Sequence, residues 1–408
     1  MKKDQISWAS VNNRSSTSSW IILLIVMLAA MNIRSGLVGF APVLPLVKEE
    51  LALNYSMTGL AQAIPVIFMG TFSGVGGYLV SLWGSKSLVS WGLLFICIGN
   101  AGRGLAPNAW VLLLTSAVFG IGLGLTQSAM PYMTKQLYPD RAGTATGIYT
   151  GGMLTGTLIG AALTLPVLLP LSGEWSWRGT LFVWSLLAAL CLLPWMTMVP
   201  KQSSWIRPPD FRTWIKTWKT WKAWHVAIIF ALQTLIFNTY TAWMPTFYYE
   251  AGIDPTGAFT FFNLVALPVT FFMPLLSDRI GKRRPMLIAA SLLALAASIA
   301  HVVWYDTWFY LWSGLLGAAN TTLFAIALVL AVDMSSKEEV GSLSALVLLF
   351  GYTVSAAATP LIGWIRDLSG NFAFGLLAFW VAASIMLLIL SWMVPANVGK
   401  PINQSSTP

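Results

Sequence analysis

The feature that most constrains this chain is a series of twelve long apolar runs separated by short polar segments. They cover residues 20–46, 56–80, 87–105, 109–131, 143–170, 177–199, 223–248, 257–276, 285–304, 308–331, 340–362 and 372–395. A helix of about 20 apolar residues crosses the hydrocarbon core of a bilayer. Only 9% of the 408 residues are charged, against about 25% in soluble domains. The sequence therefore predicts an all-α membrane protein with twelve transmembrane helices.

The distribution of Lys and Arg predicts how these helices are oriented. Because the number of spans is even, the N-terminal tail (residues 1–19) and the C-terminal tail (396–408) lie on the same side. Most of the 23 Lys and Arg residues fall on that side, which the positive-inside rule assigns to the cytoplasm. We expect a multi-pass protein of the cytoplasmic membrane with both termini cytoplasmic. The net charge of +9 then reflects topology and requires no nucleic-acid partner.

A polar and basic stretch at residues 200–222 divides the spans into two sets of six. We expect an N-terminal six-helix bundle at 20–199, a cytoplasmic linker at 200–222 and a C-terminal six-helix bundle at 223–395. The linker has tryptophans at helical spacing, Trp214, Trp218 and Trp221. This pattern favours an amphipathic helix with Trp at the lipid headgroups, and a partner-binding helix is the alternative.

Pairs of glycines indicate that the two halves are related. Gly84 follows the second span and Gly281 follows the eighth, 197 residues later. Gly143 opens the fifth span and Gly341 opens the eleventh, 198 residues later. The agreement of the two intervals favours two pseudo-symmetric halves that arose by duplication.

Arg34 is a permanent charge inside the first span. It lies 14 residues after Trp20, which places it about 21 Å along the helix and near the middle of the hydrocarbon core. A guanidinium does not lose its charge in a protein, and a charge that faces lipid at this depth is strongly unfavourable. We expect Arg34 to face a cavity and bind a solute. The alternative is a structural role in which it caps carbonyls or pairs internally.

Acidic side chains are missing from the middles of the spans. The fourteen Asp and Glu residues map to tails, loops or span ends, so the sequence lacks the intramembrane carboxylate that relays protons in many pumps. Cys97 and Cys191 lie inside spans and form no metal-binding pattern. With no nucleophile–base set either, we expect no enzymatic activity, no cofactor and no bound metal ion.

The loop after the eighth span reads P-L-L-S-D-R-I-G-K-R-R-P and resembles the cytoplasmic loop motif of the major facilitator superfamily. The resemblance implies a cytoplasmic gate made by four residues, Asp278, Arg279, Gly281 and Arg283. In such a gate the acid meets the N-terminal dipole of a neighbouring helix. The matching loop of the first half has Ser81 and Leu82 in place of the acid and the arginine, so we expect a weaker gate there.

Other stretches resemble one branch of that superfamily, the cyanate and nitroimidazole permeases. N-I-R-S-G-L-V-G-F-A-P-V-L-P (residues 32–45) is similar to the first helix of that branch, and A-L-Q-T-L-I-F-N-T-Y-T-A-W-M-P (231–245) is similar to the seventh. The segments 176–181 and 343–370 also fit. Because the chain departs from the branch at Ser35, Gln127 and residues 319–324, the resemblance does not carry cyanate over as the substrate.

The resemblance also implies that the first, fourth, seventh and tenth spans line a central cavity. With Arg34, the candidates for substrate binding are Gln127, Gln233, Asn238, Asn320, Trp243 and Tyr149. The amides would supply neutral hydrogen bonds, whereas the two aromatic residues are better explained by plain packing or by a place in the interfacial aromatic belt. Arg103, near the outer end of the third span, is a candidate for attracting anions to the entrance or for reaching the membrane interface.

Together these features predict a secondary transporter that works by alternating access. Arg34 offers a planar fork suited to a cyanate, carboxylate or nitro group, so the expected substrate is a small anionic or strongly polar solute. The alternatives are a drug or metabolite efflux pump of the same superfamily and, less favoured, a non-transporting receptor. We expect a monomer surrounded by membrane lipids, with protons as one candidate coupling ion.

Overall fold

The computed structural model describes residues 16–138, 142–201, 211–336, 339–396 and 398, and its regular structure there is helical. The first part of the chain forms α1 (Ser16–Val38), η2 (Ala41–Val43), α2 (Leu44–Glu50), α3 (Tyr55–Gly74), α4 (Gly76–Trp83), α5 (Ser85–Gly104), α6 (Ala109–Leu137), α7 (Ala142–Leu163), η4 (Thr164–Leu168), α8 (Leu169–Leu171), η5 (Gly173–Trp175) and α9 (Ser176–Met198). The second part forms α10 (Phe211–Trp218), α11 (Trp221–Glu250), α12 (Pro255–Ile280), α13 (Arg284–Val303), α14 (Phe309–Asp333), α15 (Val340–Ser369) and α16 (Phe372–Met393).

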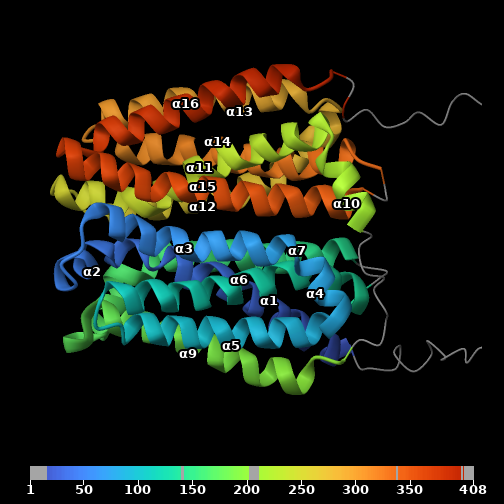
Figure 1. Ribbon diagram of the computed structural model, residues 1–408, viewed down its shortest axis with the longest axis horizontal. Helices are drawn as coiled ribbons and strands as arrows, with labels where there is room; N and C mark the ends of the chain where they lie inside the picture. Colours follow the sequence, from blue (N-terminus) through green and yellow to red (C-terminus); the bar gives the residue numbers. More distant parts are fainter. Residues whose placement is uncertain (1–15, 139–141, 202–210, 337–338, 397, 399–408) are drawn as a thin grey trace, which may run out of the picture.

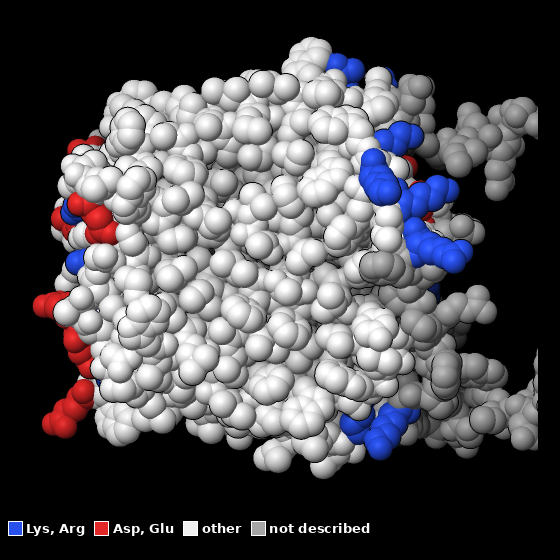
Figure 2. All heavy atoms as spheres, in the orientation of Figure 1, with Lys and Arg blue, Asp and Glu red and all other residues white. Residues whose placement is uncertain are grey.

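The long helices run side by side along the molecule in two groups (Figure 1). Helices α1 to α9 form one group, α11 to α16 form the other, and α10 lies at one end, opposite the end that carries α2. Figure 2 shows that Lys and Arg gather at the α10 end while Asp and Glu gather at the α2 end, with an uncharged band between them. A wide apolar band between two charged ends is the surface that a bilayer requires of a membrane-spanning protein.

The helices account for the predicted spans. In the described part of the chain, ten helical segments are long and apolar enough to cross a membrane, and the bent pair α3 and α4, which meet at 61°, makes an eleventh. The remaining predicted span is α5, which has 20 residues but carries Lys86 and Arg103. It packs between α6 and α9. The predicted twelve-helix fold is therefore confirmed.

Helix ends follow the local sequence. Side chains accept a hydrogen bond from the first turn at the start of α3, α6, α11, α12 and α16, where the N-caps are Asn54, Asn108, Thr220, Asp254 and Asn371. At the other end of α12, Gly281 adopts the left-handed conformation with φ 62°, which glycine tolerates without strain. Gly84, its predicted repeat partner, also has a positive φ of 76° between α4 and α5.

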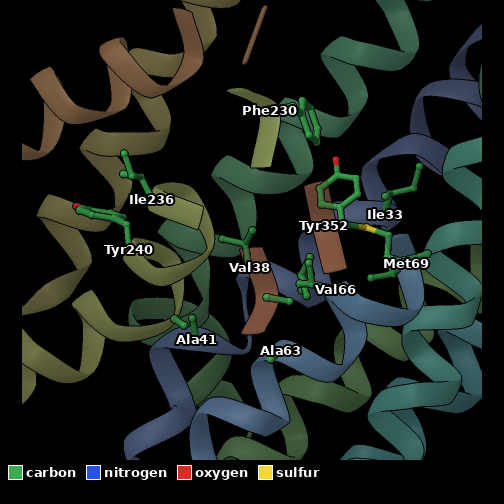
Figure 3. Close-up of a cluster of buried hydrophobic side chains, with 14 of the residues drawn as sticks. Ile33, Val38, Ala41, Ala63, Val66, Met69, Phe230, Ile236, Tyr240 and Tyr352 are labelled. Atoms are coloured by element: carbon green, nitrogen blue, oxygen red, sulfur yellow. The ribbon is translucent and has the colours of Figure 1, made fainter. Parts of the chain in front are cut away.

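Helices α3 and α15 meet across the boundary between the two groups. Their packing joins Tyr352 of α15 to Gly70 of α3, where an added Cβ would lie 2.7 Å from the Cβ of Tyr352. Figure 3 shows Ile33, Met69 and Phe230 around the Tyr352 ring. The centre of the interface between the groups is thus closely packed.

The linker contains the helix α10, and two of its tryptophans contact the protein. Trp214 and Trp218 stack on each other at 5.6 Å, and the indole nitrogen of Trp218 donates to the carbonyl of Ser342 on α15. Of the three predicted headgroup tryptophans, Trp221 is the one that is largely exposed. The Trp218 indole N–H finds a backbone acceptor at the start of α15, and Trp214 packs on Trp218 through its ring.

Helix α7 approaches α1 through glycines. An added Cβ at Gly152 or Gly156 would collide with the carbonyl oxygens of Met27 and Met31, and one at Gly160 would lie 2.7 Å from that of Ser35. Small residues allow such backbone contact between helices in membranes. These contacts fix α1 on both sides of Arg34.

The α1–α7 contact predicts the effect of a single methyl group. Gly156→Ala should lower the melting temperature of the purified protein by several degrees, because the added Cβ forces two backbones apart, at about 1–3 kcal/mol. Gly151→Ala is the matched control, since a Cβ there meets nothing within 4 Å. Equal melting temperatures for the two variants would contradict the close packing of α1 on α7.

Candidate functional site

A cavity of about 100 Å³ lies between the two groups of helices. Its walls come from α1, α7, α11, α12, α14 and α15, and the lining residues are Arg34, Thr150, Met153, Leu154, Thr157, Gln233, Thr234, Phe237, Asn263, Ala266, Thr270, Asn320, Thr321, Phe324 and Tyr352. The lining combines apolar side chains with a few hydroxyl, amide and guanidinium groups, which is the usual composition of a small-molecule site. Among the described residues, no carboxylate belongs to this lining.

Arg34 is the cation of the cavity and is 7% exposed. Its Nη2 donates to the Tyr352 hydroxyl at 3.0 Å, and its guanidinium carbon lies 5.9 Å from the centre of that ring. The ion pairs described for the chain, which join Arg178, Arg283 and Arg366 to acids, do not include Arg34. The guanidinium therefore keeps donors available for an anionic partner in a low-dielectric setting.

Tyr352 is the residue that the sequence analysis missed. Its hydroxyl accepts hydrogen bonds from Arg34 and, at 3.2 Å, from Nε2 of Gln127. Both donors belong to the first group of helices, whereas Tyr352 belongs to the second. Since an accepted hydrogen bond leaves the phenolic proton free, this hydroxyl remains able to donate to a bound solute. The available signal was a hydroxyl-bearing aromatic residue in the middle of an apolar span.

Gln233 and Asn320 line the cavity as a bonded pair. Nε2 of Gln233 donates to Oδ1 of Asn320 at 2.8 Å, and Nδ2 of Asn320 donates to the carbonyl of Gln233 at 2.9 Å. Thr234 also donates to Oε1 of Gln233. These bonds hold both amides in place, so their principal effect is to fix the polar wall opposite Arg34. Gln127, also predicted to bind substrate, is not among the residues that line the cavity, and its Oε1 is buried without a partner.

Three other predicted residues lie away from this cavity. Asn238 donates to Ser355 and lines a separate cavity of about 10 Å³. Trp243 is fully buried and donates to the carbonyl of Thr359, so it packs α11 against α15. Tyr149 is half-buried on α7 and is not among the residues that line the cavity. These residues were predicted because their helices also carry or adjoin cavity residues. Each of them lies on a face of its helix that does not line the cavity.

Arg103 was expected at an entrance, and the structure buries it completely. Its guanidinium lies 3.7 Å from the centre of the Phe40 ring and 5.0 Å from that of Phe119, and Nη1 donates to Asn100 at 3.4 Å. The Arg103 guanidinium therefore contacts two aromatic rings, and not the solvent as was expected for an entrance residue. In this conformation Arg103 holds α5 against the end of α1 and α6, so the expected exposed entrance residue is not found.

The predicted gate residues are placed as follows. Arg283 pairs with Asp333 at 2.9 Å and donates to Ser277 at 2.6 Å, contacts that lie within the second group of helices. Arg279 is exposed in the last turn of α12, and Gly281 ends that helix. The side chain of Asp278 is outside the described part of the structure. A gate between the halves at this loop therefore stays a prediction.

Two groups of helices long and apolar enough to cross a membrane, with a polar cavity between them, are the architecture expected of a membrane transport protein. The protein-family model described as "Major Facilitator Superfamily" matches residues 20–297 and 256–408 of this chain. The chain belongs to this superfamily, as its loop motif indicated.

Individual relatives extend this assignment. The cyanate transport protein CynX of Escherichia coli is 27% identical over 86% of this chain and 91% of its own length. The 2-nitroimidazole transporter of the same organism is 24% identical over 90% of this chain and 94% of its own length. The predicted resemblance to these permeases is confirmed. The inward-open xylose transporter XylE of E. coli has the same fold, with a TM-score of 0.77 at 15% identity, covering 93% of this chain and 97% of that one.

The geometry at Tyr352 predicts a specific loss. Tyr352→Phe keeps the ring against Phe230 but removes the acceptor shared by Arg34 and Gln127, which should destabilise the protein by about 1–3 kcal/mol through unsatisfied buried donors. Thermal melting in detergent measures this, with Tyr310→Phe as a control because Tyr310 is 49% exposed. Equal melting of the Tyr352→Phe variant and the unsubstituted protein would show that the hydroxyl does not hold Arg34.

Proposed function

We propose that this protein carries a small anionic or strongly polar solute, with a cyanate-, carboxylate- or nitro-like group, across the cytoplasmic membrane. The observation that carries the proposal is the charge of the cavity: the described part of its lining holds one cation, Arg34, and no carboxylate. An unneutralised guanidinium at this depth favours an anion as its partner. The relatives named for cyanate and for 2-nitroimidazole support the same kind of solute.

The volume of the cavity supports a small solute. At about 100 Å³, the cavity is smaller than the engineered cavity of about 150 Å³ that binds benzene. A solute of a few atoms therefore fits this conformation. The donors of Arg34 and Tyr352 would hold its polar group, and Phe237 and Phe324 would face the remainder.

The charge distribution supports an orientation. Lys and Arg gather at the α10 end of the molecule, and the positive-inside rule places such an end in the cytoplasm. Both termini would then be cytoplasmic, and the end that carries α2 would face outward. We refer to the α2 end as the outer end.

The hydrogen bonds at Tyr352 support alternating access between two bundles, residues 20–199 and 223–395. Arg34 and Gln127 of the first bundle bind Tyr352 of the second. An anion that takes donors from Arg34 competes with this contact, so binding would alter what holds the bundles together. A ligand shifts such an equilibrium only through its differential affinity for the two states.

An efflux pump for amphipathic compounds is the second candidate. It is favoured by the apolar part of the lining, which includes Met153, Leu154, Phe237 and Phe324. In such a pump Arg34 would be structural, and lipophilic cations would bind without it. The two candidates therefore differ in their dependence on Arg34.

Ligand-dependent melting separates the two. We expect cyanate or nitrate to raise the melting temperature of the purified protein, with a stabilisation of about 2.7 kcal/mol at 100 times the dissociation constant. Arg34→Gln should abolish this shift, because it removes the cation from the cavity. Lys216→Gln, which removes an exposed cation on α10, should preserve it. Stabilisation by tetraphenylphosphonium alone, equal in all three proteins, would overturn the anion proposal and favour efflux.

A further inference from the structure

A cluster of side chains joins the two bundles at the outer end, far from the cavity. Asp367, in the last turn of α15, accepts hydrogen bonds from the backbone N–H groups of Tyr55 and Ser56, each at 2.9 Å. The Ser56 hydroxyl donates to the same carboxylate at 2.6 Å. Tyr55 and Ser56 are the first residues of α3. A carboxylate of the second bundle thus caps the start of a helix in the first bundle.

This arrangement is electrostatically favourable. The first N–H groups of a helix have no partner within the helix and carry the positive end of its dipole. The N-cap Asn54 accepts from the N–H of Met57 through its side chain and from the N–H of Thr58 through its carbonyl, so the N–H groups of Tyr55 and Ser56 depend on Asp367. Separating the bundles at this end would expose or strand both the carboxylate and these donors.

The Tyr55 side chain adds a second set of contacts. Its hydroxyl donates to Glu250, the last residue of α11, at 2.5 Å, and Glu250 pairs with Arg366 at 3.1 Å. The guanidinium of Arg366 lies 4.7 Å from the centre of the Tyr55 ring, and the ammonium of Lys48 lies 4.2 Å from it. We define Tyr55, Ser56, Glu250, Arg366 and Asp367 as the outer latch.

A small cavity lies between the outer latch and the Arg34 site, and its lining combines four apolar residues, Leu37, Val38, Val66 and Phe237, with four polar ones. Gln62 of α3, Asn238 and Thr241 of α11, and Thr359 of α15 line this cavity of about 10 Å³, which has room for about one water molecule. Oε1 of Gln62 and Oγ1 of Thr241 are buried without partners. Buried polar groups without partners are unusual in a permanent interface, but they suit a path that is wet when the outer end opens.

We infer that the outer latch is the gate that closes the outward path of this transporter, with Asp367 as its principal residue. The inference rests on the alternating access proposed above and not on the identity of the solute. When the latch opens, the bundles separate along α3, α11 and α15, and the surface at Gln62, Asn238 and Thr241 becomes accessible from outside. The latch therefore sets the fraction of protein molecules that are in the outward-open state.

Thiol labelling without substrate tests the latch. Thr241→Cys is placed in a background in which Cys97 and Cys191 are replaced by Ala, and intact cells are treated with a membrane-impermeant maleimide. Thr241 is 4% exposed, so labelling should be slow. Adding Asp367→Asn should make it roughly tenfold faster, because the charged cap on α3 is lost. Asp306→Asn is the matched control, since that acid lies at the same end and its described bond is to the adjacent Thr307.

A second variant keeps the test decisive if Asp367→Asn does not fold. Tyr55→Phe removes one hydroxyl from the latch and should also speed labelling, by a smaller factor. Equal labelling rates in the latch variants, the Asp306→Asn control and the unsubstituted background would overturn the inference. Because labelling needs no solute, faster labelling together with a failed Arg34 melting test would reject the anion proposal and leave the latch standing.

Discussion

The contact on which this structure depends is the one between Arg34 and Tyr352. A guanidinium in a membrane-spanning helix must have partners inside the protein, and the described acidic groups leave it without a counter-ion. A phenol that accepts bonds from Arg34 and Gln127 satisfies part of that need without cancelling the charge. A carboxylate in the same place would neutralise the site. Tyr352 thus stabilises the buried cation and leaves it able to attract an anion.

The position of Arg34 is set by backbone packing and not by its own contacts. Carbonyl oxygens of Met27, Met31 and Ser35 lie against the glycines of α7, so α1 has little freedom to rotate or slide near Arg34. A side chain with several rotatable bonds gains precision when its helix is fixed in this way. The glycines of α7 that face α1, Gly152, Gly156 and Gly160, are therefore part of how the site is built, although glycine has no side chain to place in the cavity.

The sequence allowed the fold to be predicted more fully than the site. Span length, the position of Lys and Arg, and the loop motif after α12 are local features, so they identified the twelve helices and the superfamily. The sequence does not show which face of each helix points to the cavity, because in a membrane both buried and lipid-facing positions are apolar. Gln233 and Asn320 line the cavity as expected, whereas Asn238, Trp243 and Arg103 turn toward other helices. Tyr352 could not be distinguished from the other aromatic residues without its partners across the interface.

Helix α15 connects the central site to the outer end. Tyr352 and Asp367 are 15 residues apart on this helix, a separation of about 22 Å, and each contacts the opposite bundle. An anion that draws Arg34 away from Tyr352 removes one of these two attachments, and the latch at Asp367 is the other. Pro360 lies between them inside the helix and removes one backbone hydrogen bond there. Helix α15 is thus attached to the opposite bundle at two points, with fewer backbone hydrogen bonds between them. Such a helix can release one attachment before the other, which would let solute binding precede the opening of the gate.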